Sequence, residues 1–507
     1  MKKLIVLFAV STLAFNAQAQ TPPVGCTINQ YGRVANGATL WATTDQGIPP
    51  AQLPPFESNC MINQFAYNNF LYLVGDDGSG HPRFMGLAAW YNLFPGKGVP
   101  VWPGIYTTLD GVQLNKAINQ AQAGDGFALL DVASQTTAYD IRVNKPFFDY
   151  VNNKKLYLQA NMNTAAIAFN ANSYSGGVFF PPTDISDKSL GATEIKTSWR
   201  SFGSINNRLC PSDIMHCEVD DENNVWGLAG LHLVQKTNTH GEFVWASFEH
   251  TANAPDCNIS GGNPLARLPG DPTQPGSTIN VNKNYKNGLE QSGWNYFNFV
   301  SYRQNGGDGK SCVYPTQKGT NKPLCLTWPG STAKWVRTDV CRTDVLASPT
   351  TSCVALNTQH PNSQDIACLN SSVVANAPSG LAAKWKYYKL IGMEWLINGN
   401  TEGGGFGQGC FLYTGSDPCP NFKKPGGEST GAPKYSRAGS TTMANTTMET
   451  WMQNGMYLAN PADPSDVTRA LDCFACHQPQ TVAKPGKKPA SGFNEGDMSH
   501  LFSRIGQ

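Results

Sequence analysis

Short apolar or alternating runs, separated by clusters of Gly, Pro, Asn and Asp, dominate the chain from about residue 26 to about residue 300. Runs of this length and punctuation are typical of β-strands joined by turns. The clearest examples are 70–74, 127–132, 155–159, 194–200, 226–236 and 242–250. The pattern predicts a mainly β protein whose body, residues 20–300, is an antiparallel sandwich or a jelly-roll-like structure.

Two segments show helical rather than strand spacing. Apolar residues recur at helical intervals between 111 and 122, which predicts a helix packed on the β body. Thr446-Thr-Met-Glu449 matches a capping box, so a second, short helix is expected to begin near Thr447.

Residues 301–430 differ from the body. Gly, Pro, Cys and Ser interrupt this stretch, and periodicity is weak except at 382–396, where a pair of strands is expected. We expect 301–430 to be a disulfide-stapled extension and 431–507 to be a separate, small helical segment.

Composition narrows the classes of function. Charged residues make up 14% of the chain and the formal net charge is +1, whereas about 25% charged residues is usual for a soluble protein. A near-zero charge provides no long-range field to attract a polyanion, which excludes a nucleic-acid binder.

The N-terminus predicts export. Lys2-Lys3, the apolar stretch 4–15 and Ala17-Gln-Ala19 match the three regions of a bacterial signal peptide, so 1–19 is expected to be cleaved after Ala19. No other segment approaches the roughly 20 apolar residues that a transmembrane helix needs. We expect a periplasmic or secreted protein that does not span the membrane.

Export makes disulfide bonds the expected state of most of the 14 cysteines. Twelve of them lie outside the motif described next, which is consistent with six bridges. Proximity in sequence favours Cys26 with Cys60, Cys210 with Cys217, and Cys410 with Cys419, although cysteine counting leaves the connectivity open.

The remaining two cysteines form Cys473-Phe-Ala-Cys476-His477, the C-x-x-C-H attachment sequence of a c-type haem. Two thiols about one helical turn apart can each add to a haem vinyl group, and the adjacent imidazole can then bind the iron. Three alternatives are weaker: a simple Cys473–Cys476 disulfide, a thioredoxin-like redox pair, and a zinc site that also uses His500.

Around this motif the chain resembles the c-type cytochromes. The resemblance implies one covalently bound haem c, attached through Cys473 and Cys476, with His477 as the proximal iron ligand. It covers only the motif, the short helix before it and the 30 residues after it.

Helical geometry suggests the sixth iron ligand. If 498–505 is helical, Met498 shares an apolar face with Leu501, Phe502 and Ile505, while His500 points away from that face. Met498 is therefore the first candidate and His500 the second. Four upstream methionines are further candidates, although for them packing in the core is favoured over binding the iron. They are Met443, Met448, Met452 and Met456.

Charged residues and histidines of the body form weaker patterns. Alternation places Glu194, Lys196, Ser198 and Arg200 on one strand face, which predicts a solvated face or, alternatively, a charged clamp for haem propionates. A hairpin turn near His240 would place His232 and His250 on the same face, about 7–8 Å apart. These histidines could form a metal or substrate site with Glu249. We favour the alternative that each is a buried histidine whose ring nitrogens are hydrogen-bonded within the core.

Three functions follow from these patterns. The first is one-electron transfer by an exported single-haem cytochrome. The second is a haem-dependent oxidoreductase of peroxidase or oxygenase type, with its substrate site in the β body. The third is a binding module that carries a redox haem. The redox partner or small-molecule substrate is unidentified in each case.

Overall fold

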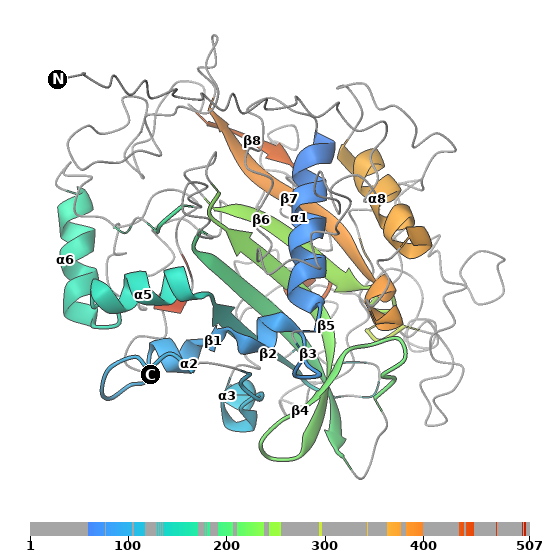
Figure 1. Cartoon of the computed structure of the whole chain (residues 1–507), viewed down its shortest axis with the longest axis horizontal. Coiled ribbons are helices and arrows are strands. Elements are labelled where there is room, and N and C mark those ends of the chain that lie inside the picture. Colours follow the sequence, from blue (N-terminus) through green and yellow to red (C-terminus); the bar gives the residue numbers. More distant parts are fainter. Residues whose placement is uncertain are drawn as a thin grey trace, which may run out of the picture.

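Eight strands form one antiparallel sheet in the computed structural model, which describes separate stretches of the chain between residues 59 and 502. The described residues are 59–76, 78–103, 106–116, 129, 131, 133, 135–170, 178, 180–182, 191–205, 210–237, 243–254, 294–296, 342, 362–376, 382–398, 435–440, 443–450, 473, 499 and 501–502. The strand order is β1-β2-β3-β5-β6-β7-β8, and β4 pairs with β5 (Figure 1).

The strands are β1 (Ala88–Ala89), β2 (Thr137–Val143), β3 (Thr193–Ser204), β4 (Cys217–Val219), β5 (Asn224–Gln235), β6 (Val244–His250), β7 (Tyr388–Asn398) and β8 (Tyr435–Gly439). The α-helices are α1 (Asn59–Val74), α2 (Trp90–Leu93), α3 (Gly111–Lys116), α5 (Lys145–Asn153), α6 (Gln159–Asn170) and α8 (Asn362–Asn376). Two short 3₁₀ helices are η3 (Arg83–Gly86) and η6 (Ala383–Tyr387). The sheet thus combines strands from both sides of residue 300.

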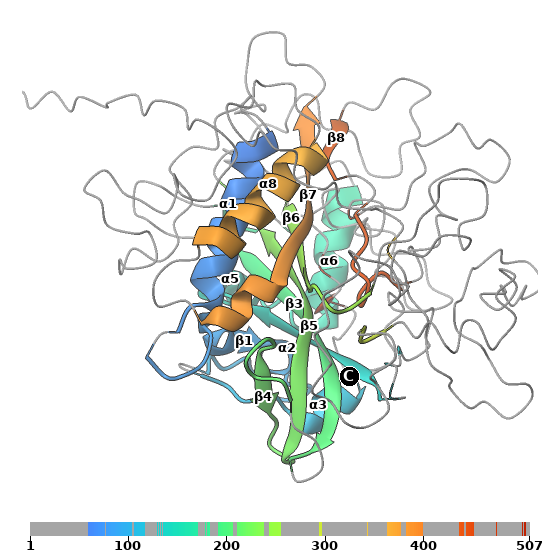
Figure 2. The same cartoon turned by 90° about the vertical axis from the view of Figure 1, so that its right-hand side faces the viewer.

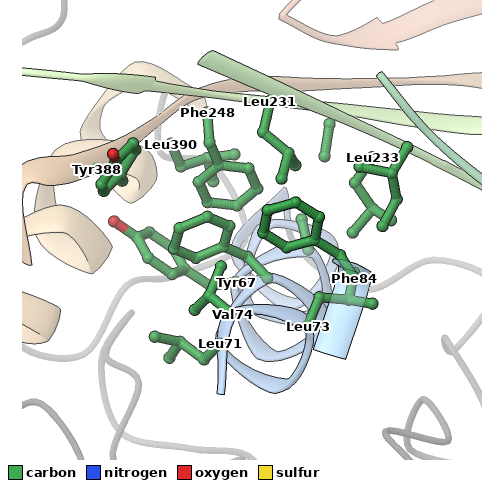
Figure 3. Close-up of a cluster of buried hydrophobic side chains, with 14 of the residues drawn as sticks. Tyr67, Leu71, Leu73, Val74, Phe84, Leu231, Leu233, Phe248, Tyr388 and Leu390 are labelled. Atoms are coloured by element: carbon green, nitrogen blue, oxygen red, sulfur yellow. The ribbon is translucent and has the colours of Figure 1, made fainter. Parts of the chain in front are cut away.

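The first face of the sheet is covered by α1 and α8, which lie together on one side of it (Figure 2). Figure 3 shows how α1 contributes to this core: the side chain of Tyr67 extends from the helix toward Phe248 on β6. The ring of Phe70 stacks on that of Phe248 at a centroid distance of 4.2 Å. Packing between helices and sheet, rather than between two sheets, therefore builds the core on this face.

The predicted β body is confirmed as an antiparallel sheet, and the three strands predicted at 194–200, 226–236 and 242–250 correspond to β3, β5 and β6. All strands of the described part of the chain belong to this one sheet. The described strands therefore do not include the second sheet that the predicted sandwich requires.

The prediction of a strand at 70–74 is wrong, because these residues end helix α1. Almost every side chain described in α1 is buried, including the polar residues Asn63 and Gln64. A helix that is buried all round lacks a clear polar face, so its apolar positions show no 3.6-residue period. The short run from Phe70 to Val74 then resembles a strand.

Two other predicted elements are corrected. Residues 155–158 form a turn between α5 and α6 instead of a strand. The stretch 382–396 contains η6 followed by the single strand β7 instead of a strand pair. The predicted helix at 111–122 is present over its described part, Gly111–Lys116.

Helix α5 begins where sequence capping rules place it. The side-chain oxygen of Asn144 accepts a hydrogen bond from the backbone N–H of Phe147 (3.1 Å), and a proline lies in the first turn of the helix. This arrangement satisfies an N–H that the helix cannot bond internally. The amphipathic helix then buries Phe147, Phe148 and Val151 against the second face of the sheet.

The predicted Cys210–Cys217 disulfide is present, with Cα atoms 6.2 Å apart. The other two favoured pairs, Cys26–Cys60 and Cys410–Cys419, lie outside the part of the chain for which disulfide partners are described. None of the described helices has the length and apolar character required to cross a lipid bilayer.

We expect Phe70→Ala to lower the free energy of unfolding by about 3–5 kcal/mol, because the truncation leaves a cavity against Phe248 in a close-packed core. Urea titration followed by tryptophan fluorescence measures this loss. Leu158→Ala is the control, because that side chain is 44% exposed and its truncation should change stability by less than about 0.5 kcal/mol. Equal effects of the two substitutions would contradict the assignment of Phe70 to the core.

Candidate functional site

The second face of the sheet carries polar and charged side chains at its centre. We call this surface the polar face; its members from the sheet are Glu194, Lys196, Ser198, Arg200, His232, Ser247, Glu249 and Glu394. All of them are buried except His232, which is partly buried. The alternation predicted for β3 is correct, since Ile195 and Trp199 point into the opposite, apolar core. The expectation that the charged face of β3 is solvated is wrong, because later segments of the chain cover it.

Cross-strand register arranges this face in three rows. The first row is Glu194, Val234, Trp245 and Glu394, on β3, β5, β6 and β7. The second row is Lys196, His232, Ser247 and Gly392 on the same strands. The third row is Ser198, Gly230, Glu249 and Lys389. Residues two apart along a strand point to the same side, and a register shift opposite Ser247 and Phe248 brings Lys389 into the third row on β7, so the three rows form one continuous surface.

Residues 443–450, which we call the covering segment, hydrogen-bond to the second and third rows. The hydroxyl groups of Thr447 and Ser198 lie 2.7 Å apart, and the side-chain amide of Asn445 donates to Ser247 Oγ (3.1 Å). The phenol of Tyr139 donates to the backbone carbonyl of Thr447 (2.6 Å). Buried polar groups in these two rows therefore find their partners in a segment about 200 residues later in the chain.

Gly230 permits this close approach. A Cβ atom at this position would lie 2.9 Å from Thr447 Oγ1 and 3.0 Å from the side-chain amide of Asn445. These separations are shorter than ordinary van der Waals contacts, so any larger residue would push the covering segment away from the sheet.

A side-chain hydrogen bond links the second row to the covering segment. His232 Nε2 lies 2.8 Å from Glu449 Oε1, and the other oxygen of Glu449 accepts the backbone N–H of Asn445 (2.9 Å). Burial by itself would raise the pKa of the Glu449 carboxyl, but His232 and the neighbouring donors outweigh it and the pKa is lowered. Glu449 is therefore held in its ionised form.

Both carboxylate oxygens of Glu249, in the third row, also have partners. One of its oxygens accepts the backbone N–H and the hydroxyl of Thr446, at 3.1 and 3.0 Å. The other forms an ion pair with Arg342. Both side chains of this pair are almost completely buried, and removing one partner of such a pair is strongly destabilising.

The first row is contacted by the C-terminal part of the chain. The backbone N–H of Cys473 donates to Glu394 Oε2 (3.0 Å), and the hydroxyl of Ser499 hydrogen-bonds to Glu194 Oε2. Burial raises the pKa of Glu194 to about 7, against smaller opposing effects of Ser499 and Lys196. Cys473 also packs against the apolar cluster that contains Trp245, Val234, Leu501 and Phe502.

Only part of the predicted haem site lies among the described residues. Cys473 is partly buried and helical, whereas Cys476, His477, Met498 and His500 fall outside the described residues. Two residues of the apolar face predicted for 498–505, Leu501 and Phe502, are buried in the cluster that Cys473 contacts.

Two of the upstream methionines considered as iron ligands are described. Met443 packs in the same apolar cluster as Leu501, and Met448 is buried between Tyr139, Ala229 and Tyr296. Both therefore have the packing role that the sequence favoured. Met452 and Met456 lie outside the described residues.

The prediction that His232 and His250 share a face is wrong. Gly230 pairs with Glu249 rather than with His250, and this one-residue difference turns His250 to the apolar side of the sheet. There His250 Nε2 hydrogen-bonds to the carbonyl of Ile214 (2.9 Å), and Nδ1 accepts the N–H of Ala252 (3.1 Å). Burial lowers the pKa of His250 to about 4, so it is a neutral, satisfied core histidine.

A second titratable cluster lies at the edge of the apolar core, and only its His216–Glu218 pair, two residues apart, is visible in the sequence. Glu218 Oε1 lies 2.8 Å from His216 Nε2 and 3.1 Å from His81 Nδ1, and Tyr106 donates to the other oxygen at 3.1 Å. Burial lowers the pKa of His216. His81 and Glu218 are 137 positions apart in the chain, so spacing alone could not have associated them.

The described residues contain no group of three or more His, Cys, Asp or Glu side chains arranged to hold a metal ion. No protein-family model matches the chain. Neither a curated protein nor a solved structure shows significant similarity to it.

The buried carboxyl of Glu194 generates a prediction about pH. Its pKa of about 7 lies above the ordinary value of 4.5, so the folded protein keeps this proton between pH 4.5 and 7 while the unfolded chain releases it. The contribution of Glu194 to stability is then present below pH 4.5 and is lost as the pH rises to 7. Glutamine at position 194 does not titrate, so Glu194→Gln removes this loss. Between pH 4.5 and 7 the free energy of unfolding of the variant should therefore rise by roughly 3 kcal/mol relative to that of the wild type. Urea unfolding at several pH values tests this, and a difference that stays constant with pH would contradict it.

Proposed function

We propose that this chain is an exported, single-haem c-type cytochrome that transfers one electron at a time. Haem c is attached to Cys473 and Cys476, and His477 is its proximal iron ligand. The observation that carries the proposal is the complete C-x-x-C-H motif, because two thiols and an imidazole at this spacing suit one porphyrin. When bound, the haem iron supplies reversible one-electron chemistry.

The surroundings of Cys473 fit such a group. A porphyrin has large apolar faces, and Cys473 borders a cluster rich in aromatic side chains, among them Trp245 and Phe502. Hydrogen bonding of its backbone N–H to Glu394 fixes the chain at the first residue of the motif. The residues described around the attachment point therefore combine an apolar contact surface with a fixed backbone.

Met498 is the proposed sixth ligand, with His500 as the alternative. Leu501 and Phe502, which follow Met498 by three and four residues, are buried in the cluster that Cys473 contacts, and this nearness to the attachment residue supports the choice. A His/Met pair raises the potential of the haem and favours electron transfer, whereas an open sixth position would favour peroxidase or oxygenase chemistry.

Export to an oxidising compartment is consistent with the Cys210–Cys217 disulfide. Haem c attachment in bacteria also takes place outside the inner membrane, so the predicted signal peptide and the motif support the same location.

Expression with a bacterial haem c maturation system should yield protein with one covalently bound haem, and Cys473→Ser combined with Cys476→Ser should abolish it. Haem staining of a denaturing gel and intact-protein mass spectrometry measure the attachment. A double variant of the structural disulfide, Cys210→Ser with Cys217→Ser, removes the same number of thiols and should keep the haem. Wild-type protein without covalent haem would overturn the proposed function.

Met498→Ala should convert a six-coordinate, low-spin haem into one that binds carbon monoxide, and should lower its reduction potential. His500→Ala is the matched comparison and should leave both properties unchanged. Optical spectra with and without reductant and carbon monoxide provide the measurement. If the wild-type haem already binds carbon monoxide, electron transfer through a closed His/Met centre is excluded and the oxidoreductase function is favoured.

A further inference from the structure

We propose that His81 is the general base of a second, hydrolytic activity, in which water cleaves esters of carboxylic acids that carry a negative charge. Glu218 is the positioning residue that holds the imidazole of His81, and Lys384 supplies the positive charge that attracts the substrate. This activity uses none of the residues assigned to the haem, so it does not rest on the function proposed above.

Glu218 is the centre of the cluster that forms this site. Its side chain is 3% exposed. Oε1 lies 3.1 Å from His81 Nδ1 and 2.8 Å from His216 Nε2, and the phenol of Tyr106 donates to Oε2 (3.1 Å). Burial by itself would raise the pKa of this carboxyl, but the two histidines outweigh it and the pKa is lowered. An ionised carboxylate only accepts hydrogen bonds, so each ring nitrogen that faces it carries a proton.

The two histidines of the cluster differ in exposure. The side chain of His216 is 4% exposed and its ring stacks on that of Trp385, with centroids 5.0 Å apart. Burial lowers the pKa of His216, so it is a neutral donor to Glu218. The side chain of His81 is 34% exposed. Because its Nδ1 donates to the buried carboxylate, Nε2 of the neutral ring carries a lone pair on the side away from Glu218. An exposed nitrogen in this tautomer can accept a proton from water.

The ring of His81 is held in place without a substrate. It stacks on Tyr106, with centroids 3.7 Å apart and planes inclined by 19°, and Tyr106 is bonded to the same carboxylate. The loop before His81 is also fixed, because Asp76 Oδ1 accepts the backbone N–H groups of Gly78 (2.7 Å) and Gly80 (3.0 Å). A base that is already oriented loses less entropy on reaching the transition state. A carboxylate bonded to Nδ1 of an imidazole is also how serine hydrolases fix the tautomer of their general base.

A positive charge lies beside this pair. Lys384, on η6, is partly exposed, and its charge acts on both Glu218 and His216. Burial lowers the pKa of this amine, and Glu218 opposes that effect. An ammonium group next to a base can bind an anionic group of the substrate and can stabilise the negative charge that develops on a carbonyl oxygen. The charge distribution therefore favours esters that carry a carboxylate.

The reaction needs water as its only co-reactant. His81 Nε2 takes a proton from a water molecule while the water oxygen forms a bond to the carbonyl carbon and the carbonyl π electrons move to oxygen. The tetrahedral intermediate then breaks its bond to the alcohol oxygen, and the imidazolium returns the proton to this leaving group. The products are a carboxylic acid and an alcohol. Nothing is oxidised or reduced, and the neutral imidazole is regenerated.

The test measures hydrolysis of 4-nitrophenyl acetate and of mono-4-nitrophenyl succinate by the full chain. His81→Ala should lower kcat/KM for both esters by about a hundredfold, the lower end of the range for general-base catalysis, and added imidazole should restore part of the rate. His232→Gln is the comparison, because His232 also hydrogen-bonds a glutamate but belongs to the polar face; it should leave the rate unchanged. Wild type that hydrolyses neither ester faster than His81→Ala would overturn the proposal.

The positioning role of Glu218 has its own readout. Glu218→Gln should lower kcat by at least about tenfold with KM unchanged, because an amide does not hold the imidazole in one tautomer as a carboxylate does. Ring ¹⁵N spectra should show the proton of His81 on Nδ1 in wild type and distributed between both nitrogens in the variant. An unchanged kcat together with an unchanged tautomer would overturn this role while leaving His81 as the base.

The charge preference is tested with Lys384→Met, which removes the charge and keeps an unbranched side chain. The variant should raise KM for the succinate ester severalfold and leave KM for the neutral acetate ester unchanged. Equal effects on the two esters would overturn the assignment of anionic substrates. None of these measurements reads the haem, so a wild-type protein without covalent haem would overturn the proposed function and leave this inference standing.

Discussion

Burial of charge on the second face of the sheet is the constraint on which the rest of the structure depends. Lys196, Arg200, Glu249 and Glu394 are buried there together with the carboxyl of Glu194, and burying a charged or polar group without a partner costs more free energy than a marginally stable protein can lose. Partners come from remote parts of the chain: Asp131 binds Arg200, Thr446 and Arg342 bind Glu249, and Cys473 and Ser499 bind the two outer carboxylates. The covering segment and the described C-terminal residues are thus part of the folded body.

The two faces of the sheet have different roles. Helices α1 and α8 bury an aromatic core on the first face, where transfer of apolar surface from water supplies most of the stabilisation. Hydrogen bonds and ion pairs on the second face contribute less net stability but determine which segments dock and in which register.

Local alternation predicted β3, β5 and β6, and the short spacing predicted the Cys210–Cys217 bridge. Alternation also identified the charged side of β3, from Glu194 to Arg200. The errors have physical causes. Phe70 to Val74 form a helix because α1 is buried all round and shows no polar face. His250 lies on the apolar side because strand pairing differs by one residue from the register inferred for the hairpin. In the cluster of His81, His216 and Glu218, the last two residues are neighbours in sequence, but His81 is 137 positions from Glu218, too distant for a pattern to associate.

The motif on which the proposed haem attachment rests can be read from the sequence without the structure. Cys473, Cys476 and His477 form a motif whose spacing is set by local geometry, and a strand's two-residue period assigns side chains to faces without knowledge of the partner strand. Tertiary structure alone decided which of those faces is buried and what covers it. A charged face on an isolated strand would be solvated, and Glu194 is instead buried because Ser499, more than 300 residues away, supplies its hydrogen bond. Long-range pairing of this kind depends on the mutual fit of remote segments, which no local pattern of residues encodes.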